Sequence, residues 1–136
     1  MTELLNSVGP YLDLVGRILY AAIFIRSGVN HLTKTDMLTQ YAAAYKVPAA
    51  RTLVIVSGVM ILVGGLAVLT GWHPRVGAVL IFVALVGMTY YMHGYWRETE
   101  PMSQVSQMTH FMKNVAMAGA ALLIIVRGTG PLSLGR

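Results

Sequence analysis

Four apolar runs, each about long enough to cross a bilayer, dominate this sequence of 136 residues. A bilayer core of about 30 Å requires a helix of roughly 20 mostly apolar residues. The runs cover residues 11–32, 49–71, 74–95 and 106–127. They are continuous and lack the period-2 alternation of strands in a membrane barrel, so we expect helices. Because the connections are short, neighbouring helices should run antiparallel, which predicts a four-helix up-down membrane bundle with both termini on one side.

The low content of charged side chains supports embedding in a membrane. Asp, Glu, Lys and Arg make up 11% of the residues, whereas soluble domains average about 25%. The length predicts a single transmembrane domain over residues 1–136. No small-residue cleavage site follows the first apolar run, so we expect that run to remain as a membrane anchor instead of being removed as a signal peptide.

The sequence contains no cysteine, which excludes disulfides, thiolate metal sites, iron–sulfur clusters and cysteine redox relays. The net charge of +5 comes from scattered Lys and Arg. We attribute these residues to contacts with the headgroups of the lipid bilayer, and we expect no nucleic-acid partner. Their distribution leaves the orientation in the membrane open.

A short segment between the first two runs, Asp36–Val47, cannot span a bilayer. Its larger apolar side chains, Met37, Leu38, Tyr41 and Tyr45, fall near one face of a helix. This spacing predicts a short amphipathic helix that lies in the membrane interface. A plain connector is the alternative.

Polar side chains gather at the end of the predicted bundle that lies opposite the termini. Three of the four spans contribute to this set, which consists of Arg26, Asn30, His93, Trp96, Arg97, His110, Lys113 and Asn114. Long Arg and Lys side chains can reach the headgroups from within a span. Short His and Asn side chains cannot, so a shared pocket with a cationic lining explains the set better than separate headgroup contacts.

Such a pocket suits a quinone headgroup or a small oxyanion. Lys and Arg stabilise negative charge, imidazole exchanges protons near neutral pH, and Trp stacks on a flat ring. We predict three catalytic groups: His93, His110 and Lys113. We predict five quinone-binding groups: Arg26, Asn30, Trp96, Arg97 and Asn114. No metal is expected among so many cations, and haem held by the two histidines is not expected either.

At the opposite end, Asp13 and Arg17 are spaced as an i,i+4 pair on the first span, and we predict that they neutralise each other as a structural pair.

The order and spacing of short motifs along nearly the whole chain resemble the DoxX family. These motifs are Gly16-Arg17, Phe24, Ser27-Gly28, His31-Leu32, Val47-Pro48, Gly64-Gly65-Leu66, Gly71, Arg75, Gly77, His93-Gly94-Tyr95-Trp96, Phe111-Met112-Lys113-Asn114 and Gly119. The resemblance implies a four-helix, multi-pass protein of a bacterial or archaeal inner membrane. It also implies that Arg17, His93, Trp96, Lys113 and Asn114 are family-typical polar positions, whereas Arg26 and His110 match the pattern less closely.

The resemblance implies a function only in part. Some members of the family are the membrane subunit of a thiosulfate:quinone oxidoreductase, others associate with redox-stress proteins, and many have no assigned activity. We therefore predict a subunit of a quinone-linked oxidoreductase that works with other membrane or soluble redox subunits. A non-catalytic accessory or scaffold subunit is the main alternative. A small-solute carrier is a third, although the chain lacks the internal repeat that such carriers use.

Overall fold

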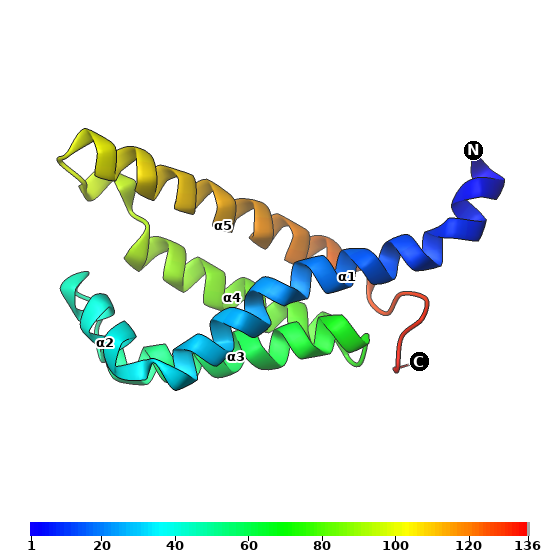
Figure 1. The fold of residues 1–136 in the computed structure, drawn as a ribbon, viewed down its shortest axis with the longest axis horizontal. Coiled ribbons are helices and arrows are strands. Elements are labelled where there is room, and N and C mark those ends of the chain that lie inside the picture. Colours follow the sequence, from blue (N-terminus) through cyan, green and yellow to red (C-terminus); the bar gives the residue numbers. More distant parts are fainter. Residues whose placement is uncertain (136) are drawn as a thin grey trace.

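The computed structural model describes residues 1–135, which form helices and no strand (Figure 1). Four helical segments are long and apolar enough to cross a membrane, and they contain α1 (Thr2–Thr33), α3 (Ala50–Thr70), α4 (Pro74–Met92) and α5 (Pro101–Arg127). The short helix α2 (Thr35–Ala44) connects α1 to α3, and a single 3-10 turn, η1 (Tyr95–Arg97), precedes α5. The predicted four-helix membrane fold with a short helix between the first two spans is confirmed.

The spanning helices pack in chain order, α1 against α3, α3 against α4, and α4 against α5. Figure 1 shows both termini at one end of the molecule, called here the terminal end, and α2 and η1 at the other, called here the α2 end. Tyr20 on α1 donates a hydrogen bond to the carbonyl of Met117 on α5 over 2.9 Å. Beyond this contact α1 and α5 diverge toward the α2 end (Figure 1), so the bundle is open there.

Two glycines let α1 and α3 approach closely at the α2 end. A Cβ atom added to Gly28 would lie 2.6 Å from the Cβ of Leu62, and one added to Gly58 would meet the Cβ of His31. Small residues allow such approach where lipid supplies no hydrophobic drive between helices. Apolar side chains including Phe24 and Ile61 continue the core from this contact toward α4.

Two helices begin earlier than the apolar runs predict, so those boundaries were wrong. α1 begins at Thr2 instead of residue 11, and α5 begins at Pro101 instead of residue 106. Hydropathy marks only the part of a helix that suits the bilayer core. The start of α5 is set by Glu100, whose carboxylate accepts hydrogen bonds from the backbone N–H groups of Met102 (3.1 Å) and Ser103 (2.7 Å). Proline suits the first turn, where its missing N–H is not needed.

Candidate functional site

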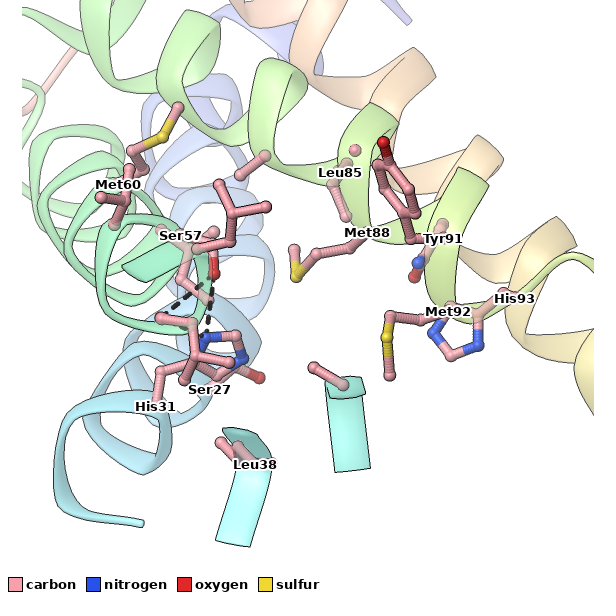
Figure 2. Close-up of a pocket in the computed structure, with 18 of the residues that line it drawn as sticks. Ser27, His31, Leu38, Ser57, Met60, Leu85, Met88, Tyr91, Met92 and His93 are labelled. Carbon is pink, nitrogen blue, oxygen red and sulfur yellow. Dashed lines mark hydrogen bonds between the residues drawn. The ribbon is translucent and has the colours of Figure 1, made fainter. Parts of the chain in front are cut away.

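A cavity of about 470 Å³ lies at the α2 end, where α1 and α5 diverge. All five α-helices contribute to its walls, which are mainly apolar and include four methionines, Met60, Met88, Met92 and Met117. Figure 2 shows methionines from α3 and α4 around its centre. Because most of the wall belongs to membrane-spanning helices, the cavity suits a ligand that is itself soluble in lipid.

His93, at the end of α4, connects the cavity to two other elements. Its Nδ1 atom lies 2.8 Å from Oε1 of Gln107 on α5. Gln107 in turn donates from Nε2 to the hydroxyl of Tyr45, just after α2, over 2.8 Å. An amide oxygen only accepts hydrogen bonds, so Nδ1 of His93 carries the hydrogen. Gln107 is buried and both ends of its amide are paired, so the ring of His93 is held in one orientation at the cavity wall.

Tyr45 accepts this hydrogen bond beside Tyr41, and the centroids of the two tyrosine rings lie 5.2 Å apart. The interaction with Tyr41 raises the pKa of Tyr45 above its ordinary value, and partial burial raises it further.

Two adjacent residues of α5, Lys113 and Asn114, also line the cavity. Asn114 is only 6% exposed, and no residue within 1–135 forms a hydrogen bond with its side-chain amide. Buried polar groups are nearly always hydrogen-bonded, so this amide is available to a ligand. Lys113 is more exposed, and its Nζ lies 3.5 Å from Nδ1 of His110. His110 stacks on His93, with ring centroids 5.2 Å apart, but it is exposed and does not line the cavity.

Two other predicted binding residues, Arg97 and Trp96, lie beside the end of α4 and outside the cavity lining. Arg97 donates hydrogen bonds to the carbonyls of Tyr90 and Tyr91. Its guanidinium carbon lies 5.3 Å from the ring centre of Tyr90 and 5.5 Å from that of Trp96. These contacts cap the last turn of α4, since the carbonyls at a helix end have no partner within the helix.

The last two predicted binding residues, Arg26 and Asn30, belong to a face of α1 that does not line the cavity. Of the eight predicted site residues, three are brought together at the cavity: His93, Lys113 and Asn114. Their catalytic and binding roles stay predictions.

His31 on α1 lines the cavity although the polar pattern did not single it out as a site residue. Its Nδ1 lies 3.1 Å from the carbonyl oxygen of Val54 and 3.1 Å from the hydroxyl of Ser57, both on α3 (Figure 2). The available signal was Gly28, which marks the face of α1 that packs on α3. Ser27 and His31 lie near that face. Both faces of α1 are apolar, so hydropathy alone does not identify the face that packs on α3.

At the terminal end, Arg17 and Asp13 form the i,i+4 ion pair, with Nε and Oδ2 3.0 Å apart. Arg17 is buried, and it also donates hydrogen bonds to the carbonyls of Pro131 (2.8 Å), Leu132 (3.0 Å) and Leu69 (3.3 Å). The pair therefore joins α1 to the end of α3 and to the segment that follows α5.

Comparison with known proteins agrees with this architecture. The DoxX family model matches residues 12–94. The chain is 33% identical to the inner membrane protein YphA of Escherichia coli K12 over 127 residues, which is 93% of this chain and 90% of the relative. It is 29% identical to the inner membrane protein YqjF of the same organism over 123 residues, 90% of this chain and 88% of the relative. No solved structure matches the chain. This chain is an inner membrane protein that belongs to the DoxX family.

Proposed function

We propose that the chain is the quinone-binding membrane subunit of an oxidoreductase, with its site in the cavity at the α2 end. The observation that carries this proposal is the Asn114 amide, which is buried in an apolar cavity and has no hydrogen-bond partner among residues 1–135. A ligand oxygen next to Asn114 in the cavity would accept a hydrogen bond from this amide.

The shape and lining of the cavity support a ligand with a flat polar head and an apolar tail. Small-molecule sites typically enclose about 300 to 1,000 Å³ and are mostly apolar, with a few polar groups that fix orientation. This cavity has about 470 Å³, and its polar groups include His93, Lys113 and Asn114 among methionine and aliphatic side chains. A lipid-soluble quinone has this distribution of polar and apolar surface.

The polar residues have the properties that quinone reduction requires. Reduction of a quinone to a quinol consumes two electrons and two protons. Lys113 would stabilise negative charge that develops on the ring oxygen. His93 would exchange a proton through Nε2, because Nδ1 is engaged with Gln107. Asn114 would donate a hydrogen bond to a ring oxygen and so orient the head. The electrons would come from a reduced sulfur compound such as thiosulfate, through a partner subunit, as the family resemblance suggests.

Binding of a quinone to the purified protein tests the proposal. Decyl-ubiquinone should bind the wild-type chain in detergent micelles of constant composition, and Asn114→Leu should weaken binding because it removes the unpaired amide. Asn6→Leu is the matched control, because Asn6 is exposed at the terminal end. Thermal melting of both variants would verify folding.

Two results would contradict the proposal. If the wild-type protein binds neither decyl-ubiquinone nor a short-tailed menaquinone, the quinone-site reading is wrong and an accessory subunit becomes the better description. If quinone binds but Asn114→Leu and Asn6→Leu bind it equally, the ligand occupies another part of the protein.

A further inference from the structure

Two histidines line the cavity from different helices, His31 from α1 and His93 from α4. Figure 2 shows them on opposite sides of the space, with methionine side chains between them. Neither ring is free to rotate, because each Nδ1 atom already has a protein partner.

Both partners fix the same nitrogen as the hydrogen donor. Nδ1 of His31 faces the carbonyl oxygen of Val54, and a carbonyl only accepts. Nδ1 of His93 faces the amide oxygen of Gln107. The orientation of that amide is set by its other end, which donates to Tyr45. In each ring Nε2 is therefore the nitrogen that remains for a ligand, and in the neutral ring it is an acceptor.

We infer that His31 and His93 hold the two opposite oxygens of one ligand head between α1 and α4, each through Nε2. This inference rests on the proposed function and names His31 as a binding residue of the same site. A pair of such groups on opposite walls selects a ring that carries an oxygen at each end, as a 1,4-quinone and its quinol do. A neutral Nε2 accepts from a quinol hydroxyl, and a protonated one donates to a quinone carbonyl.

The two-ended geometry also explains the position of the other polar groups. Lys113 and Asn114 belong to α5, which packs against α4, so they reach the ligand from the same side as His93. On the side formed by α1 and α3, the cavity is lined by His31 together with the hydroxyls of Ser27 and Ser57, and His31 is the imidazole that lies across the cavity from His93.

A double-mutant comparison with two ligands tests the inference. Binding of decyl-ubiquinol and of 4-decylphenol, which has one oxygen, would be measured in detergent micelles for His31→Ala, His93→Ala and the double variant. For the quinol, each single change should weaken binding about 2- to 10-fold, as expected for the loss of one hydrogen bond. The two losses should multiply, because each concerns a different oxygen. The one oxygen of the phenol can pair with either histidine but not with both. Each single change should therefore leave phenol binding nearly unchanged, and only the double variant should lose the equivalent of one hydrogen bond.

Controls separate this inference from the proposed function and from misfolding. His73→Ala, in the turn between α3 and α4 at the terminal end, should bind like the wild type. His31→Gln, which keeps a hydrogen-bonding arm, should bind the quinol better than His31→Ala. If wild type binds no quinol or quinone, the proposed function fails. If wild type binds and His93→Ala weakens binding while His31→Ala does not, only the inference is overturned.

Discussion

Gln107 shows how a buried residue without charge can control a charged site. Its amide joins His93 on α4 to Tyr45 after α2, with 2.8 Å at each contact. The hydrogen bonds run in one direction, because Nδ1 of His93 donates to Oε1 of Gln107 and Nε2 of Gln107 donates to the hydroxyl of Tyr45. This direction selects the nitrogen with which His93 can act in the cavity.

Replacement of His93 and of Lys113 should separate proton transfer from binding. His93→Ala should lower thiosulfate-dependent quinone reduction in membranes by about 10²- to 10⁴-fold, the usual loss when one general acid is removed. Lys113→Met should mainly weaken quinone binding and so raise KM, because it removes a cation. His73→Ala serves as the control. Full activity in both site variants, at equal expression, would assign the chemistry to other residues.

The side chains of the site were predictable from sequence only where helix faces were unambiguous. Asn114 has a short amide side chain within an apolar span, so a place inside the bundle was expected for it. On α1, Arg26 and Asn30 were selected because charged and amide groups in a span require an explanation. The close packing of Gly28 on α3 turns a different face of α1 toward the cavity, and His31 lies there.

The beginning of α5 illustrates a local signal at the scale of an element. Glu100 and Pro101 together specify the start of a helix, since the carboxylate caps the first N–H groups and proline suits the first turn. The apolar pattern could not reveal this start, because the first turn of α5 is polar. A helix that begins at Pro101 places Gln107 in its second turn, where it meets His93.

The Glu100 cap should make the first turn of α5 sensitive to acid. Hydrogen bonds from the backbone N–H groups of Ser103 and Met102 hold the pKa of Glu100 below its ordinary value. Because the pKa of Glu100 is lowered in the folded protein, the cap stabilises the helix fully when the pH is above the ordinary pKa of Glu. This stabilisation is lost as the pH falls through the lowered pKa. The amide resonance of Ser103 should therefore shift on acidification in NMR spectra of the micellar protein. Glu100→Gln should abolish that shift, and an unchanged titration in this variant would exclude the cap as its cause.

The whole molecule is closed at one end and open at the other. At the terminal end, Arg17 joins three segments of the chain, and Arg75 at the start of α4 donates to the carbonyls of Ile125 and Val126 on α5. At the α2 end, α1 and α5 diverge and leave the cavity. The four spans could be predicted because run length is a local property. The cavity could not, because it depends on the angle between helices that are distant in sequence.

The closure at the terminal end should depend on Arg17. Arg17→Met would leave the carboxylate of Asp13 with only the exposed Arg127 as an ion-pair partner, at a site where the side chains of Arg17 and Asp13 are 9% and 16% exposed. Breaking a buried pair from one side typically destabilises a protein by about 3 to 5 kcal/mol. The variant should melt at a lower temperature in detergent, and the segment after α5 should become susceptible to carboxypeptidase, because two of its carbonyls lose their donor.

Arg127 provides the matched control, because it approaches the same carboxylate at 3.9 Å but its side chain is 76% exposed. Exposed ion pairs contribute about 0 to 1 kcal/mol, so Arg127→Met should melt close to the wild type. The double variant Asp13→Asn with Arg17→Met should recover part of the lost stability, since no charge is then left unpaired. Equal melting temperatures for Arg17→Met and Arg127→Met would show that the buried Arg17 pair stabilises the protein no more than the exposed Arg127 pair. The terminal end would then be held by helix packing alone.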